Sequence, residues 1–319
     1  MRALVCGAAG FVGSHLVARL LDDGWQVLGV DSFLTGNLRR NLGPVLDRTG
    51  FEFLEADIVR SLAVAGPLDA VFHLASPASP ADFSSLQLEI LRVHSHGMWN
   101  LLELARTKQA RFLYTSSSEV YGDPEVHPQR EDYVGHVDPI GTRSCYDEGK
   151  RFGEALVMAY HRRHGLRTSI ARLFNTYGPH MRPDDGRVIP SFVSSALRGE
   201  PARIHGDGSQ TRSFCYVDDT VEGLCRLLNS DLREPVNLGN PDERTILELA
   251  EIINDLAGNE ADCVFRELPH ADDPKRRQPD ITRARRHLGW EPRVSLLDGL
   301  GRTVGWFRQV MDKGPDEPV

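Results

Sequence analysis

The sequence predicts an α/β protein: a Rossmann-type, doubly wound parallel sheet followed by a smaller C-terminal α/β lobe. Three observations lead to this prediction. Apolar runs of strand length alternate with amphipathic segments of helix length, as in proteins that wrap helices around a parallel sheet. A glycine-rich turn, "GAAGFVGSH", follows the first apolar run directly. The 319 residues are enough for a large core and two lobes.

The first half of the chain supplies the elements of the sheet. Its apolar runs are nearly continuous, which is typical of strands buried on both faces. We expect strands at residues 2–7, 25–31, 51–57, 68–75, 110–117 and 167–174. Helical periodicity predicts the intervening helices at residues 11–22, 84–107 and 145–164.

Beyond residue 175 a loop rich in Pro and Gly introduces shorter elements. Helices are expected at residues 187–198, 245–257 and 295–312, and strands at residues 235–239 and 262–267. We predict that residues 1–175 form the dinucleotide-binding domain. The chain is expected to return to this domain at about residues 208–238. The second lobe would comprise 176–207 and 239–312, with a tail at 313–319. In the returning segment, Asp218 or Asp219 is expected to cap a helix.

Composition and charge exclude several classes of function. The net charge of −8 and the absence of a basic stripe argue against binding to a nucleic-acid backbone. No apolar run reaches the length of a membrane span, and glycines interrupt the N-terminal run too early for a signal peptide. The five cysteines are scattered, which favours reduced thiols and a cytoplasmic protein. His94 and His96 lie two residues apart and diverge on a helix, so no metal site is expected.

The glycine-rich turn predicts a dinucleotide site. Gly7, Gly10 and Gly13 lie between the first strand and the first helix, where backbone amides can approach a pyrophosphate. The amides of Phe11 and Val12, at the helix N-terminus, add favourable partial charge. The alternative is a tight turn that serves only to pack the helix on the strand.

A second group of residues is expected to bind the nucleosides of the cofactor. Asp31 ends the second strand, where a carboxylate accepts hydrogen bonds from ribose hydroxyls and repels a 2′-phosphate, so NAD is favoured over NADP. Arg39 and Arg40 weaken that preference slightly. Asp57 either binds the adenine amine or caps a helix. Further cofactor contacts are expected at Ile58, Leu74, Ala75, Ser76 and Thr115.

Tyr146 and Lys150 lie four residues apart in "CYDEGK", on one face of a predicted helix. Lys150 could bond the nicotinamide ribose and lower the pKa of Tyr146 by its charge. An ordinary phenol, with a pKa near 10, is a poor base at neutral pH, and a neighbouring cation brings it into range. Taken alone, the pair would be read as a surface helix carrying an aromatic and a cation.

Several longer motifs occur in order along the chain: "HLASPASP", "TSSSEVYGDPEVHP", "CYDEGKR", "RLFNTYGP", "GDGSQTRSF" and "PVNLGNP". With them the sequence resembles the extended short-chain dehydrogenase/reductase family over residues 1–309, and within it the enzymes that decarboxylate UDP-glucuronate. The resemblance implies conversion of UDP-glucuronate to UDP-xylose through a 4-keto sugar, with NAD regenerated in each cycle. It also implies a homodimer formed through helices 84–107 and 145–164, and a second lobe that binds the nucleotide sugar.

The resemblance assigns roles to individual residues. Tyr146 would take the C4 hydroxyl proton, and Ser117 or Ser118 would hold the C4 oxygen, unless these serines only cap the strand end. Glu119 would assist proton handling at C5. Arg212 would neutralise substrate charge, unless it forms a surface ion pair. The remaining substrate contacts are expected at Asn175, Arg187, Val188, His205, Gln210 and Arg277.

Sister activities share the first oxidation and diverge afterwards. A 4,6-dehydratase carries an acid where this chain has Ser118, and a 4-epimerase usually has a small residue at the position of Glu119. UDP-glucuronate 4-epimerase, or another nucleotide-sugar epimerase or dehydratase, is the main alternative. A non-catalytic NAD-binding module is a distant one, because such proteins typically lose Tyr146 or Lys150.

Three histidines depart from the family pattern. His94 replaces an Asn, and His205 replaces a Tyr beside the expected uracil site. His180 replaces an Arg, and Arg182 is the candidate to take the place of that Arg. These departures affect the expected recognition of the sugar and the base.

Overall fold

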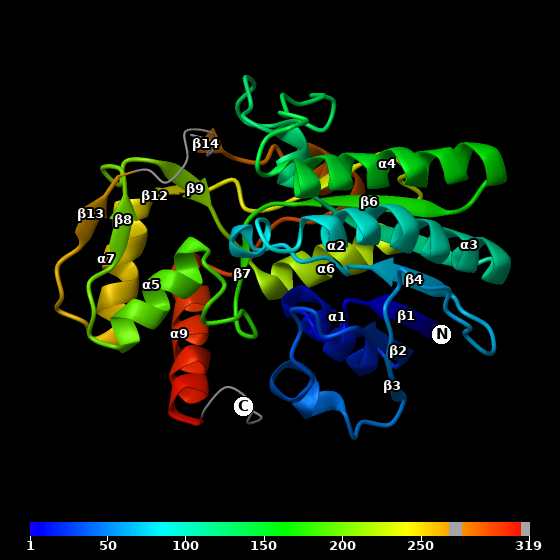
Figure 1. Cartoon of the computed structure of the whole chain (residues 1–319), viewed down its shortest axis with the longest axis horizontal. Coiled ribbons are helices and arrows are strands. Elements are labelled where there is room, and N and C mark those ends of the chain that lie inside the picture. The colour runs from blue at the N-terminus through cyan, green and yellow to red at the C-terminus, as the bar shows by residue number, and fades with distance from the viewer. Residues whose placement is uncertain (268–275, 314–319) are drawn as a thin grey trace.

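The computed structural model describes residues 1–267 and 276–313 and shows a seven-stranded parallel sheet flanked by helices (Figure 1). The strand order is β11-β6-β5-β4-β1-β2-β3, and each neighbouring pair is parallel. The chain winds outward from β1 in one direction and then in the other, so the predicted doubly wound fold is confirmed. The strands are β1 (Arg2–Cys6), β2 (Gln26–Asp31), β3 (Phe51–Glu55), β4 (Ala70–His73), β5 (Arg111–Ser117), β6 (Thr168–Leu173) and β11 (Val236–Leu238).

Helices cover both faces of the sheet, which explains why its strands are apolar throughout. One face carries α1 (Phe11–Asp22) and α6 (Val217–Leu228). The other carries α3 (Met98–Lys108) and α4 (Ser144–His164), with α2 (Gln87–Arg92) packed against α4. The inner strands β1, β2, β4 and β5 are buried almost along their whole length. The expected burial on both faces is wrong for β3, because β3 is the edge strand and is partly exposed.

The single helix predicted over residues 84–107 is interrupted. A π-helical turn, η4 (Val93–Gly97), separates α2 from α3. This turn places His94 in the interior, fully buried, beneath Gly149 of α4. A Cβ at Gly149 would lie 2.9 Å from Cδ2 of His94, so α4 approaches the turn this closely only because residue 149 is a glycine. The interruption therefore brings a histidine to the start of α4.

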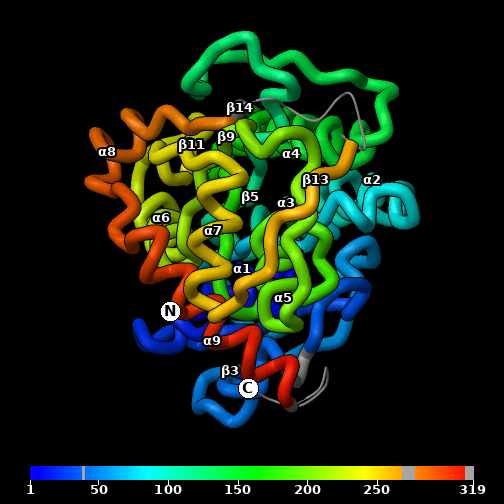
Figure 2. The backbone as a smooth tube through the Cα atoms, turned by 90° about the vertical axis from the view of Figure 1, so that its left-hand side faces the viewer, coloured from blue at the N-terminus to red at the C-terminus, as the bar shows by residue number. Residues whose placement is uncertain are grey.

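The C-terminal part of the chain builds a smaller unit beside the sheet (Figure 2). Its helices are α5 (Val188–Leu197), α7 (Ile246–Ala257) and α9 (Leu296–Lys313). Short strands complete it: β8 (Arg203–His205), β9 (Thr211–Ser213), β12 (Glu243–Thr245), β13 (Val264–Arg266) and β14 (Arg276–Arg277). The remaining elements are η1 (Leu38–Leu42), η2 (Gly43–Val45), η3 (Pro80–Asp82), η5 (Ser118–Tyr121), β7 (Thr176–Tyr177), β10 (Cys215–Tyr216) and α8 (Thr282–Leu288).

Neither Asp218 nor Asp219 caps α6, because Tyr216 is the residue at the N-cap and both aspartates lie in the first turn. Asp219 instead accepts hydrogen bonds from the amides of Arg293 and Val294, at 3.0 and 2.9 Å, and so ties α6 to the segment before α9. The predicted tail lies outside the described residues except for its first residue, and the division into two domains stays a prediction.

Within residues 1–267 and 276–313, no helix has both the length and the apolar character needed to span a membrane. The same residues contain no group of three or more His, Cys, Asp or Glu side chains that could hold a metal ion.

Candidate active site

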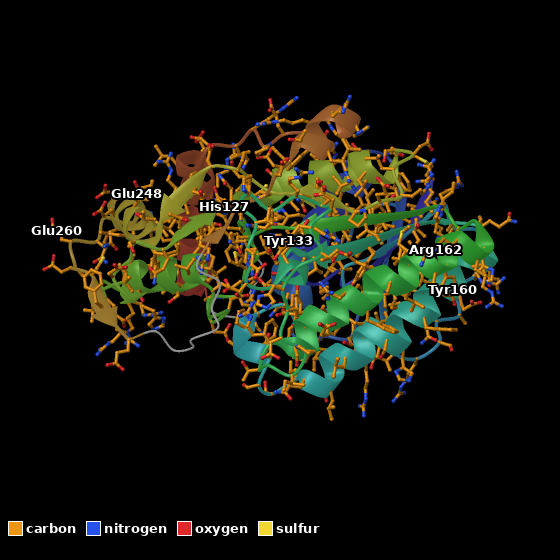
Figure 3. All side chains as sticks on the ribbon, turned by 90° about the horizontal axis from the view of Figure 1, so that it is seen from above. His127, Tyr133, Tyr160, Arg162, Glu248 and Glu260 are labelled. Carbon is orange, nitrogen blue, oxygen red and sulfur yellow. The ribbon has the colours of Figure 1, made fainter. Side chains whose placement is uncertain are left out.

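A cavity of about 440 Å³ opens at the carboxyl ends of the strands, between the sheet and the smaller unit. Ligands of open α/β sheets bind in this position. In Figure 3, Glu248 and Glu260 mark the smaller unit, Tyr160 and Arg162 mark the far end of α4, and His127 lies between the two regions. All predicted catalytic and substrate residues line the cavity: Ser117, Ser118, Glu119, Tyr146, Lys150, Asn175, Arg187, Val188, His205, Gln210, Arg212 and Arg277.

The glycine-rich turn has the geometry of a pyrophosphate cradle. Gly7 has a φ of +83°, and a Cβ on it would lie 2.7 Å from the backbone nitrogen of Ala75. Gly10 is the N-cap of α1, and no side chain among the described residues caps that helix. The first amides of α1, including those of Phe11 and Val12, therefore face outward as donors for an anion. Phe11 and Val12 also line the cavity.

Of the three glycines in the turn, Gly13 leaves the least space for a side chain. Replacing it should abolish cofactor binding. A Cβ on Gly13 would lie 1.9 Å from the carbonyl oxygen of Gly7, so Gly13→Ala must push α1 away from the turn. We expect a loss of stability of about 1–3 kcal/mol and no measurable NAD binding by calorimetry. Gly301→Ala, where a Cβ meets nothing within 4 Å, is the control and should bind NAD normally. Unchanged affinity in Gly13→Ala would contradict the cradle.

The predicted nucleoside contacts are divided by the cavity: Leu74, Ser76 and Thr115 line it, whereas Asp31, Asp57, Ile58 and Ala75 lie outside its lining. The Asp31 carboxylate ends β2 and accepts hydrogen bonds from the amides of Ala9 and Phe33, at 3.0 and 2.9 Å. Its burial raises the pKa of Asp31, whereas these amides lower it. Asp57 is exposed and closes a turn by accepting a hydrogen bond from the amide of Val59, so it caps no helix. Its contact with adenine stays a prediction, as do those of Ile58 and Ala75.

Tyr146 and Lys150 converge at the start of α4, both almost fully buried. Nζ of Lys150 lies 5.3 Å from the centre of the Tyr146 ring and donates a 2.8 Å hydrogen bond to the carbonyl oxygen of Thr115. The reading of this helix as a plain surface helix is therefore wrong at these two positions.

The pKa of Tyr146 lies above its usual value and not below it, in contrast to the expected effect of Lys150. Burial raises the pKa of Tyr146 to about 12, although a hydrogen bond with Ser117 opposes this shift. Burial also lowers the pKa of Lys150 to about 7, so the ammonium that was to favour the phenolate is itself disfavoured in the apolar interior. The phenol is consequently protonated at neutral pH in this environment.

The ring of Tyr146 is held from two sides. Phe83 stacks on it at a centroid distance of 4.9 Å, and His94 meets it edge-on at 6.1 Å. His94 is in turn fixed by hydrogen bonds to Ser76 Oγ at 3.0 Å and to the Tyr114 hydroxyl at 3.2 Å. Aromatic contacts of this kind restrict the ring to one orientation.

The two ring nitrogens of His94 face two hydroxyls. Nε2 lies 3.0 Å from Ser76 Oγ, which is also 2.9 Å from the carbonyl oxygen of Pro77, and Nδ1 lies 3.2 Å from the Tyr114 hydroxyl. Each hydroxyl can donate or accept, so both neutral tautomers satisfy these contacts. Ser76 lines the cavity, so this neutral histidine contacts a hydroxyl on the cofactor side of the site.

Buried histidines should make the protein sensitive to acid. Burial lowers the pKa of His73 and of His180 to about 3, and that of His94 well below its usual 6.5. Unfolded histidines bind a proton below about pH 6.5 and these rings do not, so stability should fall as the pH drops, by about 2 kcal/mol per histidine at about pH 5. Urea unfolding at about pH 7.5 and pH 5 measures the loss, which should be smaller in His94→Asn. An equal loss in both proteins would contradict this prediction.

Glu119 lies between two guanidinium groups. Arg143 donates to Oε2 at 2.7 Å, and Arg277 makes a close contact with Oε1. Burial by itself would raise the pKa of Glu119, but Arg277 and Arg143 outweigh it and hold the pKa at about 2. Arg277 also bonds Ser118 Oγ at 3.3 Å and the carbonyl oxygen of Gly122 at 3.0 Å. A carboxylate that is ionised at neutral pH thus lines the same cavity as the hydroxyls of Ser117 and Tyr146.

Most of the predicted substrate contacts come from the smaller unit, whereas Arg277 contacts Glu119 and Asn175 follows β6. Arg187 forms a bidentate pair with Asp185, and Gln210 donates through its amide to the carbonyl oxygen of His205 at 2.6 Å. The amide oxygen of Gln210 is buried without a hydrogen-bond partner, as expected of a group that receives a ligand donor. Arg212 lines the cavity and donates a hydrogen bond to the carbonyl oxygen of Thr211 at 2.9 Å, and its role toward the substrate stays a prediction.

His180 and Arg182 contact different parts of the molecule. His180 bonds Ser14 of α1 at 2.8 Å and packs against the ring of His15. Arg182 pairs with Asp82 at 3.0 Å and ties the loop before α5 to η3. That Arg182 takes the place of an arginine at position 180 stays a prediction.

Sequence reasoning missed three residues of the site. Arg143 precedes Tyr146 by three residues, a spacing that could have revealed it. Phe83 lies in a loop with no periodic pattern, and nothing in the sequence pointed to it. Asp147 is buried, with Oδ1 lacking a hydrogen-bond partner, and burial together with Glu119 raises its pKa to about 7.

Comparison with known proteins adds independent evidence. The profile described as the NAD dependent epimerase/dehydratase family matches residues 3–239. UDP-glucuronic acid decarboxylase 1 of Danio rerio is 48% identical to this chain over 312 residues, which cover 98% of this chain and 73% of that protein.

Two solved structures resemble the whole chain. The UDP-glucose 4-epimerase of Thermotoga maritima, solved with UDP-glucose, is 30% identical with a TM-score of 0.87, covering 98% of this chain and 100% of that one. The UDP-glucuronic acid 4-epimerase of Bacillus cereus, solved with UDP-glucuronic acid and NAD, is 29% identical with a TM-score of 0.87, covering 97% and 100%.

Proposed function

Because the chain belongs to the NAD-dependent epimerase/dehydratase family, we propose that it decarboxylates UDP-glucuronate to UDP-xylose. The observation that carries this proposal is Glu119, held ionised between Arg143 and Arg277 beside Tyr146. The match to UDP-glucuronic acid decarboxylases over nearly the whole chain supports the same assignment.

The residues of the first lobe fit NAD. The uncapped amides at the start of α1, and the room that Gly7 and Gly13 leave, suit a pyrophosphate. Asp31 presents a carboxylate for ribose hydroxyls, and Lys150 reaches the strand end where the nicotinamide ribose would lie. When bound, NAD supplies reversible oxidation at C4 of the sugar and is not consumed over the cycle.

Tyr146 and Ser117 handle the proton at C4. Ser117 hydrogen-bonds the phenol, so both hydroxyls can face one sugar oxygen. Tyr146 removes the C4 proton in its phenolate form, which is the minor form at neutral pH because burial raises the pKa of the phenol to about 12. It returns the proton when the ketone is reduced. The 4-keto acid between these steps loses CO₂ because the electron pair released at C5 spreads onto the C4 oxygen.

Glu119 distinguishes decarboxylation from epimerisation. A carboxylate with a pKa of about 2 carries no proton at neutral pH and cannot itself act as the general acid. We therefore propose that Glu119 orients the group that protonates C5 after CO₂ has left. Glu119 also ties Arg277 and Arg143 to this wall of the cavity. The alternative is UDP-glucuronate 4-epimerase, favoured by the likeness to the Bacillus cereus structure.

Mass spectrometry of the product from UDP-glucuronate, without added reductant, separates the candidate functions. Decarboxylation lowers the product mass by one CO₂, dehydration lowers it by one water, and epimerisation changes only the retention time. An NAD-binding module without catalytic activity leaves the substrate untouched. We expect the loss of CO₂, and any other outcome would overturn the proposal.

We propose further that the protein forms a homodimer through α2, α3 and α4. Large apolar side chains on these helices are exposed, with Leu88 at 63%, Trp99 at 54% and Phe152 at 48% exposure. The helices pack side by side (Figure 1), so their outer surfaces can form one apolar interface. Light scattering should give twice the chain mass, and Phe152→Asp should halve it. A monomeric wild-type protein would contradict this arrangement.

A further inference from the structure

We propose that Asp82 and Arg182 form a gate that controls how fast NAD enters and leaves its site. The pair joins two segments of the chain that both contribute to the lining of the cavity. One segment, residues 76–83, follows β4, and the other, the loop at residues 178–187, leads from β7 to α5. The inference concerns binding of the cofactor alone, so it does not depend on which reaction of the sugar follows.

The 178–187 loop begins beside the pyrophosphate cradle. His180 bonds Ser14 at 2.8 Å, and the carbonyl oxygen of Pro179 accepts a hydrogen bond from Nε2 of His15 at 3.0 Å. Ser14 directly follows Gly13, the last glycine of the turn, and both Ser14 and His15 belong to the start of α1. The first part of the loop is therefore fixed next to the amides that suit the phosphates of the cofactor.

The later part of the loop is bound to the 76–83 segment. Arg182 donates through Nη2 to both carboxylate oxygens of Asp82, at 3.1 and 3.0 Å. A second contact lies nearby, where the buried hydroxyl of Ser79 donates to the carbonyl oxygen of Asp185. Asp82 and Ser79 belong to η3 and its N-cap, so the loop forms a bridge from α1 to η3.

This bridge crosses the path that NAD would take through the cavity. The cofactor extends from the amides of Phe11 and Val12, which suit its pyrophosphate, toward Lys150, which suits its nicotinamide ribose. Both ends of that path belong to the lining of the same cavity. The two bridged segments contribute to this lining between them, through Ala78, Pro80, Met181 and Gly186. We therefore infer that the bridge has to open when the dinucleotide enters or leaves.

The ion pair should act on the rates of binding rather than on the affinity. Asp82 and Arg182 both lie outside the cavity lining, so neither is placed to contact the cofactor. Their side chains are 16% and 22% exposed, so the charged hydrogen bonds are partly shielded from solvent. Each opening breaks these bonds, whether NAD is entering or leaving. Slow exchange suits a cycle in which one NAD molecule oxidises a sugar and then reduces the same sugar.

Stopped-flow fluorescence with NADH as the probe tests the inference on the full chain. Mixing gives the association rate, and displacement by excess NAD⁺ gives the dissociation rate. We expect Arg182→Gln and Asp82→Asn each to raise both rates about tenfold, as for loss of a charged hydrogen bond, with the dissociation constant changed less than about twofold. The double variant should match the single ones, because one interaction is lost in all three. Arg198→Gln removes an ion pair with Glu200 elsewhere in the smaller unit and should change neither rate.

Faster dissociation with unchanged association would mean that the pair supports the binding site itself, and it would overturn the gate, as would unchanged rates. Should one variant fail to fold, the other decides together with added salt. Salt weakens a partly exposed ion pair, so it should speed exchange in the wild-type protein more than in the folded variant. Equal salt dependence would contradict the inference. Release of CO₂ with NADH rates unaffected by the substitutions rejects the gate and retains the decarboxylase, whereas faster exchange in a protein that releases no CO₂ does the reverse.

Discussion

Replacing Tyr146 by Phe is expected to lower turnover of UDP-glucuronate by about 10²- to 10⁴-fold. The substitution removes the hydroxyl that takes the C4 proton and keeps the ring that Phe83 and His94 hold in place. Because the ring packing survives, stability and NAD affinity should stay near the wild-type values. Release of CO₂ measures the first effect, and thermal melting together with calorimetry measures the other two.

Tyr160→Phe is the matched control for this experiment. Tyr160 lies on the same helix, and its hydroxyl donates to Glu103 at 2.6 Å, away from the cavity (Figure 3). We expect its turnover to be normal. Near-normal turnover of Tyr146→Phe itself would remove Tyr146 from the mechanism and leave the proton at C4 without an assigned acceptor.

Replacing Glu119 by Gln is expected to have the largest combined effect on stability and chemistry. The change leaves the guanidinium groups of Arg143 and Arg277 without their shared carboxylate. Loss of one member of a buried charge cluster costs about 3–5 kcal/mol, measurable as a lower midpoint in urea. Decarboxylation should slow much more than NAD binding weakens, because Glu119 lies beside the sugar and apart from the glycine-rich turn.

Glu154→Gln separates the two effects of that change. Glu154 forms a buried pair with Arg172 at 2.7 Å, two turns along the same face of α4 as Tyr146, so its loss should destabilise the protein similarly. It lies outside the cavity lining and acts on the site by raising the pKa of Lys150, so CO₂ release at a temperature where both variants are folded should fall much less than in Glu119→Gln. If Glu119→Gln lost NAD affinity while its chemistry survived, the assignment of Glu119 would be incorrect.

Much of the fold follows from local features of the sequence. Strands β1, β2, β4, β5 and β6 were predictable because buried parallel strands are apolar at every position. The break in the helix at Val93–Gly97 was not, because a π-helical turn preserves the apolar periodicity on both sides of it. Helix α8 was missed as well, since its short segment "TRARRHL" offers almost no apolar face.

The candidate site was predictable where spacing along one element fixes geometry. Tyr146 and Lys150 face the same cavity because they are one helical turn apart. The link between Glu119 and Arg277 spans 158 residues and depends on how β14 lies against β9, which no local pattern encodes. The pKa of Tyr146 was likewise misjudged, because burial depends on the surrounding packing rather than on the neighbour in the helix.

The π-helical turn has a consequence for the deletion of a single residue. Each residue of an α-helix turns the chain by about 100°. Removing Ser95 would let α2 and α3 merge into one regular helix, and His94 would rotate away from Ser76 and Tyr114. The side chain that then lay beneath Gly149 would differ in size and polarity, although no residue touching the sugar had been altered. Deleting this residue would thus change the orientation of the Tyr146 ring, and with it the reaction, because His94 packs against that ring.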